Sequence, residues 1–112
     1  DRKKDMIVSG GFNIFPREVE DVLSQHADVA MVAVVGVPDD KWGEAVTAVI
    51  VAREDARPNA DELINLVKSR KGSAHAPKQI QFVDQLPMTG VGKVDKKVLK
   101  AGFWTGRDRM VG

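Results

Sequence analysis

The sequence predicts an α+β domain in which a small mixed β-sheet is flanked by helices and preceded by a short two-stranded hairpin. Three observations lead to this prediction. Two adjacent glycines separate short apolar runs near the start, two stretches rich in β-branched residues follow, and apolar residues recur elsewhere at helical spacing. A chain of 112 residues is long enough for one domain with one core. The expected order is hairpin, helix, strand, strand, helix, strand, loop and helix, which is that of an α+β domain.

The hairpin is expected over residues 6–15, because Gly10 and Gly11 can enter positive φ without steric cost between two short apolar runs. Pro16 then suits the first turn of a helix, where its missing N–H is not needed. This helix is predicted over residues 16–26. Its stripe at helical spacing consists of Val19, Val22, Leu23 and His26.

Two central strands are predicted over residues 29–37 and 45–52, because both stretches are rich in β-branched residues and too short for buried helices. Asn59 is placed to cap a second helix, and Gly72 is placed to end it. The apolar stripe of this helix consists of Leu63, Ile64 and Val67. Residues 79–83 alternate between polar and apolar, which indicates a half-exposed strand.

A loop is expected over residues 84–93, since it contains Pro87 and two glycines. Asp95 can cap a short last helix that continues to about residue 103. The α+β core is therefore expected over residues 16–103, followed by a tail over residues 104–112 that carries no recognisable motif.

Composition excludes several classes of function. The formal net charge of +1 gives no reason to expect binding to nucleic acid, and the absence of cysteine excludes disulfides and thiolate metal sites. His26 and His75 lie far apart in the sequence, so no metal ligands are predicted. No apolar run approaches the roughly 20 residues that span a bilayer, and there is no signal peptide, so we expect a cytoplasmic protein without a transmembrane segment. The start at Asp1, inside a charged run, indicates a fragment cut at a domain boundary.

The strongest local pattern is the loop Met88-Thr89-Gly90-Val91-Gly92-Lys93. Its two glycines let the backbone approach a ligand closely, and Lys93 can present a positive charge to a carboxylate or a phosphate. It is not a P-loop, because the glycine spacing differs and Val94 stands where Ser or Thr would bind magnesium. Taken alone, such a pattern is more often a surface turn with a solvated lysine. Trp42, in another polar loop, can cap the core or stack on a ligand, and the first role is the commoner one.

Three sequence motifs, including this loop, occur along the chain in the order that is found in one protein family. The opening run DRKKDMIVSGGFNIFPREVE resembles the hinge-and-hairpin motif of the C-terminal domain of the adenylate-forming superfamily, which holds acyl-CoA synthetases, firefly luciferase and nonribosomal peptide synthetase adenylation domains. The run VGVPD at residues 35–39, taken with Trp42-Gly43-Glu44, resembles the next signature of that family. The run LPMTGVGKVDK at residues 86–96 resembles its catalytic-lysine motif. The resemblance covers residue 1 to about residue 99.

The resemblance implies a two-step reaction. A carboxylic acid and ATP form acyl-AMP, and coenzyme A then displaces AMP to give a thioester. ATP and coenzyme A are thus the implied substrates, and Mg²⁺ accompanies ATP in an N-terminal ATP- and acyl-binding domain that this chain lacks. That domain of the same polypeptide is the implied partner. Lys93 matches the catalytic lysine of the adenylation step, and the isolated chain is expected to be inactive.

In this family two faces of the domain take turns at the active site. Lys4, in the hinge of residues 1–5, matches the residue about which the domain swings. Arg2 matches an arginine that contacts the nucleotide, and Asn13 matches an asparagine near the same site, so both are assigned to nucleotide binding. The residues that the resemblance assigns to coenzyme A binding are Ser9, Gly10, Gly11, Trp42 and Lys78.

Two alternatives stay open. The chain can belong to an adenylation domain that loads a carrier protein, or it can be a free-standing binding module that is not an enzyme. The sequence also departs from many acyl-CoA synthetases at Ala74-His75-Ala76, where those proteins carry an aromatic–basic pair.

Overall fold

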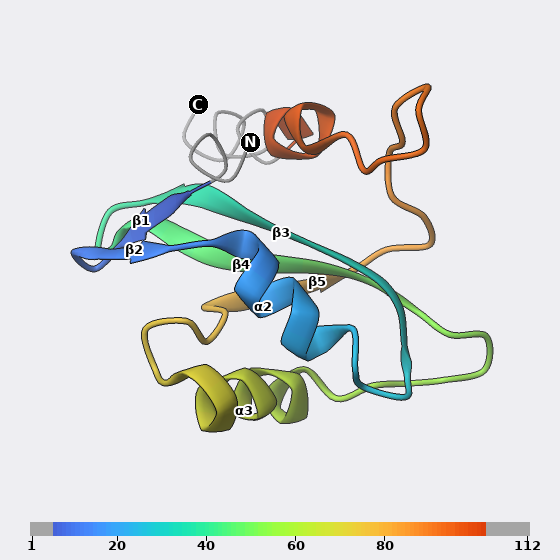
Figure 1. The fold of residues 1–112 in the computed structure, drawn as a ribbon, viewed down its shortest axis with the longest axis horizontal. Coiled ribbons are helices and arrows are strands. Elements are labelled where there is room, and N and C mark those ends of the chain that lie inside the picture. Colours follow the sequence, from blue (N-terminus) through green and yellow to red (C-terminus); the bar gives the residue numbers. More distant parts are fainter. Residues whose placement is uncertain (1–5, 103–112) are drawn as a thin grey trace.

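The computed structural model describes residues 6–102, so the predicted nucleotide contact of Arg2, the predicted hinge at Lys4 and the predicted tail lie outside the described residues. Within this range the chain forms a five-stranded mixed sheet with helices on both faces (Figure 1), which confirms the predicted fold class. The strands are β1 (Ile7–Ser9), β2 (Phe12–Ile14), β3 (Val29–Asp39), β4 (Gly43–Ala52) and β5 (Gln79–Phe82). The helices are α2 (Pro16–Leu23), α3 (Ala60–Lys71) and a helical stretch at residues 96–102.

Strand β4 is the centre of the sheet. It pairs antiparallel with β3 along its whole length, antiparallel with β1 at Gly43, and parallel with β5 from Thr47 to Ile50. The prediction that residues 29–37 form a central strand is wrong, because β3 lies at an edge of the sheet. Its sequence is typical of a central strand because both faces of the sheet are covered, so that apolar side chains are buried on each side.

Helix α2 begins at Pro16 as predicted but ends at Leu23 rather than at residue 26. Pro16 occupies the first turn, and the apolar stripe is buried against the rest of the core. After Leu23 the backbone closes tighter turns, in which Gln25 N–H donates to the carbonyl of Val22 at 3.2 Å and His26 N–H donates to the carbonyl of Leu23 at 3.1 Å. These turns redirect the chain into β3. His26 therefore lies outside the helix, although its spacing from Val22 and Leu23 is helical.

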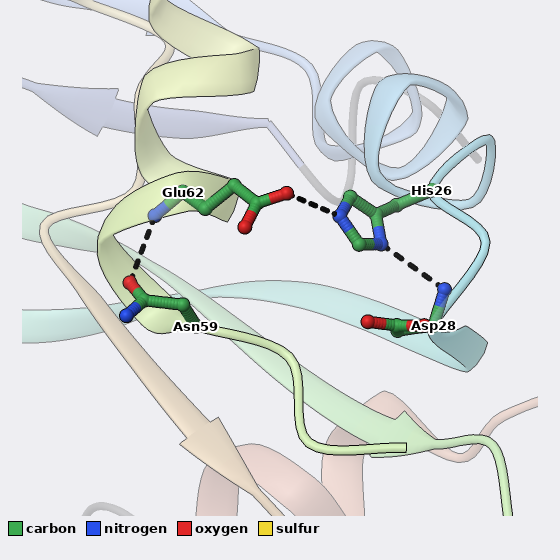
Figure 2. Close-up of polar contacts among 4 residues, drawn as sticks. All are labelled: His26, Asp28, Asn59 and Glu62. Carbon is green, nitrogen blue, oxygen red and sulfur yellow. Dashed lines mark hydrogen bonds and ion pairs between the residues drawn. The ribbon is translucent and has the colours of Figure 1, made fainter.

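His26 links the end of α2 to the beginning of α3 (Figure 2). Its Nε2 lies 3.0 Å from Oε1 of Glu62, and its Nδ1 accepts a hydrogen bond from the N–H of Asp28 at 3.1 Å. Because Nδ1 is an acceptor, the proton of the neutral ring lies on Nε2 and is donated to Glu62. Asn59 caps α3 as predicted, since its side chain accepts from Glu62 N–H at 3.1 Å, and Gly72 ends the helix with a φ of 95°.

Two clusters of buried side chains lie on opposite faces of the sheet. The larger cluster lies between the sheet and helices α2 and α3, and β1 and β2 contribute Ile7 and Ile14 to it. The smaller cluster consists of Ala33, Val49 and Leu86, with Val83, Val94 and Leu99 packed against it. Successive residues of a strand point to opposite faces, so Ala33 and Val34 each serve a different cluster. Residues 83–99 are therefore fixed to the face that α2 and α3 leave open.

Candidate active site

Lys93 lies at the end of a tight loop over residues 88–93, which we call the lysine loop. Thr89 closes this loop: its N–H donates to the carbonyl of Lys93 at 2.7 Å, and its hydroxyl accepts a hydrogen bond from Lys93 N–H at 3.3 Å. Gly92 has a φ of 84°, a conformation that favours glycine. Asp95 then caps the helical stretch at residues 96–102 as predicted, accepting from Val98 N–H at 3.2 Å. The backbone of Lys93 is thus held in place while its side chain is exposed.

A groove of about 770 Å³ borders the lysine loop. Its lining combines the start of α2 with β3 and the lysine loop and includes Phe15, Arg17, Glu20, Val32, Lys93, Lys96 and Lys97. Lys96 is neutralised there, because its Nζ lies 2.8 Å from Oε2 of Glu20, and the same oxygen accepts the N–H of Val34 at 2.8 Å. Within residues 6–102 the ammonium of Lys93 forms no ion pair. Its charge is available to an anionic ligand.

The turn between β1 and β2 consists of Gly10 and Gly11, as predicted. Their φ angles are 59° and 85°, which is the geometry of a tight hairpin turn with two left-handed residues. A Cβ on Gly10 would lie 2.9 Å from Cε3 of Trp42, so the indole packs directly against this turn. Gly10 N–H also donates to the carbonyl of Trp42 at 2.9 Å. Around Gly11, by contrast, a Cβ would meet no atom of the described residues within 4 Å.

Two lysine side chains, those of Lys41 and Lys78, lie over the ring of Trp42 next to the hairpin turn. Nζ of Lys78 lies 4.6 Å from the centroid of that ring, and Nζ of Lys41 lies 5.1 Å from it, both within the range of cation–π attraction. Asp39 shapes the turn that carries Trp42, because its Oδ1 accepts the N–H of Lys41 at 2.8 Å and that of Trp42 at 3.1 Å. Sequence reasoning missed Lys41, for which the only signal is its position next to Trp42. We call the set Gly10, Gly11, Lys41, Trp42 and Lys78 the hairpin surface.

Ser9 and Asn13, which were also assigned to ligand binding, lie on opposite faces of the hairpin. Ser9 pairs with Phe12, whereas Asn13 pairs with Val8. Ser9 is only 3 % exposed, and within the part of the chain that the structure describes its hydroxyl has no hydrogen-bond partner. Asn13 is exposed to solvent. Ser9 therefore precedes the hairpin surface with its side chain buried, and Asn13 lies outside that surface.

The lysine loop and the hairpin surface occupy different sides of the molecule. In Figure 1 the turn between β1 and β2 lies at the left, whereas the loop that follows β5 reaches to the upper right. The structure thus brings Gly10, Trp42 and Lys78 together, and the lysine loop lies elsewhere.

The two histidines are engaged at separate places. His26 contacts Glu62, and Nε2 of His75 lies 3.7 Å from Oε1 of Glu18 on α2. Among the described residues there is no group of three or more side chains suited to hold a metal ion. No helix between residues 6 and 102 has the length and apolar character needed to cross a membrane.

The fold, the glycine turn beside a tryptophan and the exposed lysine on a glycine-containing loop are those expected from the resemblance to the C-terminal domain of adenylate-forming enzymes. The model of the family described as "AMP-binding enzyme C-terminal domain" matches residues 18–93. The chain therefore belongs to this family, which confirms the resemblance found in the sequence.

Acyl-CoA ligases and an amide bond synthetase are among the relatives of this chain. It is 57% identical over 119 residues to the medium/long-chain-fatty-acid–CoA ligase FadD8 of Mycobacterium tuberculosis, covering 100% of this chain and 21% of that protein. The crystal structure of Brucella canis acyl-CoA synthetase matches with a TM-score of 0.89 at 34% identity, over 96% of this chain and 20% of that one. Amide bond synthetase McbA from Marinactinospora thermotolerans matches with a TM-score of 0.86 at 42% identity, over 92% of this chain and 21% of that one. The chain spans about one fifth of the length of these relatives.

Proposed function

We propose that this chain is part of a ligase that converts a carboxylic acid and ATP into acyl-AMP and pyrophosphate, and then transfers the acyl group to the thiol of coenzyme A. Its similarity to an enzyme named as a medium/long-chain-fatty-acid–CoA ligase supports a fatty acid as the substrate. The observation that carries the proposal is the separation of the lysine loop from the hairpin surface, because the two half-reactions need different groups.

The first half-reaction needs a fixed positive charge. Attack of a carboxylate on the α-phosphate of ATP brings two anions together, and the transition state gathers further negative charge. A cation held in advance at that point lowers the barrier, and removal of one such group typically costs about 10²–10³ in rate. Lys93 suits this role because Thr89 fixes its backbone and its ammonium has no ion-pair partner among residues 6–102.

The second half-reaction needs access for the thin pantetheine arm of coenzyme A. Gly11 leaves open space at the hairpin turn, where a side chain would obstruct the arm. Lys41 and Lys78, both above the ring of Trp42, supply positive charge for the phosphates of coenzyme A. The hairpin surface therefore combines a narrow, side-chain-free edge with an aromatic and cationic platform.

The rest of the proposed enzyme comprises an N-terminal domain that binds ATP with its Mg²⁺ and the acyl group. In this proposal Arg2 and Asn13 contribute to nucleotide binding, and Lys4 is the hinge about which the domain exchanges its two surfaces. The proposed location is the cytoplasm, where ATP and coenzyme A are available.

A different acceptor is the second candidate. McbA is named an amide bond synthetase, so proteins with a similar domain differ in the group that receives the acyl chain. The two lysines over Trp42 favour an acceptor that carries phosphate, which coenzyme A and a carrier-protein phosphopantetheine do and a simple amine does not. Assays of the complete ligase with coenzyme A, a phosphopantetheinylated carrier protein and an amine would separate these acceptors.

Replacement of Lys93 by alanine in the complete ligase tests the assignment of the lysine loop. We expect acyl-AMP formation, measured by pyrophosphate exchange, to fall by about 10²–10³, because the transition state loses its fixed cation. Thioester formation from supplied acyl-AMP should fall far less. Lys68→Ala is the matched control, since Lys68 is an exposed lysine of α3 without a role in either surface.

The complementary variant is Gly11→Asn. Asparagine tolerates positive φ better than other residues with a side chain, and it meets no described atom there, so the fold should be retained. Thioester formation should decrease while acyl-AMP formation is preserved. Equal losses of both half-reactions in Lys93→Ala, or no loss of the thioester step in Gly11→Asn, would refute the assignment of one half-reaction to each surface.

A further inference from the structure

We infer that Glu44 is a positioning residue for the thioester half-reaction, because its carboxylate fixes the hairpin that carries Gly10 and Gly11. Oε1 of Glu44, on β4, accepts the backbone N–H of Val8, on β1, at 2.9 Å. An ionised acceptor makes this bond shorter and stronger than a bond between neutral groups. Glu44 itself is only partly exposed and touches no residue of the hairpin surface in a hydrogen bond that the structure describes.

The hairpin needs such support because its pairing with the rest of the sheet is short. Strands β1 and β4 share a single register pair, Ser9 with Gly43. Beyond that pair, the carboxylate of Glu44 holds Val8 on one side, and the bond from Gly10 N–H to the Trp42 carbonyl holds the turn on the other. A two-stranded hairpin is at best marginally stable by itself, so these attachments, together with the buried side chains of Ile7 and Ile14, decide where its turn lies.

Gly36 provides the space that the carboxylate occupies. Gly36 pairs with Val46 and lies on the same face of the sheet as Glu44, one diagonal step away. A Cβ on Gly36 would lie 2.8 Å from Oε2 of Glu44 and 3.2 Å from Cγ2 of Ile7. Because the nearest atom is the end of a flexible side chain, Gly36→Ala can be accommodated by moving the carboxylate away from Val8. The structure thus offers a second way to break the same contact, in which the side chain of Ile7 must also shift slightly.

The functional consequence rests on the proposed function, in which the hairpin surface serves coenzyme A and the lysine loop serves ATP. A displacement of reacting groups by about 1 Å can cost about 10²-fold in rate. Loss of the Glu44 contact should therefore harm the half-reaction that uses the hairpin and spare the one that uses Lys93.

The test measures both half-reactions of the complete ligase in Glu44→Ala, Glu44→Gln and Gly36→Ala. Glu44→Ala and Gly36→Ala are expected to lower kcat/KM for coenzyme A by about tenfold to hundredfold, with pyrophosphate exchange within about twofold of the parent enzyme. Glu44→Gln keeps an oxygen that accepts from Val8 N–H and should recover most of the loss. Glu54→Ala, at an exposed glutamate between β4 and α3, is the matched control and should change neither half-reaction.

The outcomes either support or refute the positioning role of Glu44. Preserved pyrophosphate exchange shows that a variant is folded. If Glu44→Ala does not fold, Gly36→Ala still tests whether loss of the contact impairs the thioester step. An unchanged kcat/KM for coenzyme A in Gly36→Ala, or equal losses in both half-reactions, overturns the inference about Glu44. If Gly11→Asn also leaves the thioester step intact, the failure lies in the proposed function of the hairpin. If Gly11→Asn impairs that step and Glu44→Ala does not, only the role of Glu44 is refuted.

Discussion

At the scale of single residues, His26 shows how one side chain connects two helices. Sequence spacing alone placed it on the apolar stripe of α2, but in the structure it lies beyond the helix and has two polar partners. Its ring must accept a hydrogen bond from Asp28 N–H and donate one to Glu62, so only one neutral tautomer satisfies both.

Replacement of His26 by alanine is expected to lower the free energy of unfolding of the chain by about 1–2 kcal/mol, since two hydrogen bonds are lost. Urea denaturation measures the change. Glu62 is largely exposed, so a double-mutant cycle with Glu62→Ala, which removes the acceptor, should assign only about 0.2–1 kcal/mol to this pair. Asp61→Asn removes a neighbouring charge from the same helical turn and serves as the control. A coupling energy of zero in the cycle would mean that the His26–Glu62 contact does not stabilise the fold.

At the scale of elements, the segment after β5 is the least regular part of the fold and carries Lys93. It is attached to the sheet by the apolar contacts of Leu86 and Val94, and to α2 by the ion pair between Lys96 and Glu20. Glu20 also accepts the N–H of Val34, so one carboxylate joins α2, β3 and the start of the last helix. This arrangement connects the position of the lysine loop to the rigid part of the molecule.

Replacement of Glu20 by alanine should loosen this junction. Because the N–H of Val34 loses its acceptor and Lys96 loses its counter-charge, we expect a loss of about 1–3 kcal/mol in the free energy of unfolding. Hydrogen exchange should accelerate at Val34 and across residues 88–99. Glu20→Gln, which retains an acceptor for Val34, should show a smaller effect. Exchange at Val34 that is unchanged in Glu20→Ala would contradict this account of the junction.

Sequence reasoning succeeded where the determinants are local. The Gly10–Gly11 turn, the first turn of α2 at Pro16 and the caps of α3 depend on neighbours within a few residues. It failed or was silent where residues far apart in the chain decide the structure. The edge position of β3 and the contacts of Glu20 with Val34 and Lys96 have no local signal. The contact between Gly10 and Trp42 is likewise fixed only by the assembled sheet.

At the scale of the whole molecule, both surfaces are built on one sheet, with a buried cluster on each face. Expressed alone, the chain of 112 residues is expected to unfold in a single cooperative transition, observed alike by circular dichroism and tryptophan fluorescence. It should form no acyl-AMP from ATP and a fatty acid, because the proposed ATP-binding domain is missing. The complete ligase is the positive control, and turnover by the chain alone would show that Lys93 does not depend on a second domain.

The position of β3 has a consequence for solubility. An edge strand presents unpaired backbone groups to which a strand of another molecule can add. On β3 the N–H of Val34 is occupied by the carboxylate of Glu20, and Pro38 has no N–H to offer. At Val34 and Pro38, β3 therefore offers no free N–H to the carbonyl groups of an incoming strand. We therefore expect the Glu20 carboxylate, which also holds the segment after β5, to disfavour strand addition at the open edge of the sheet.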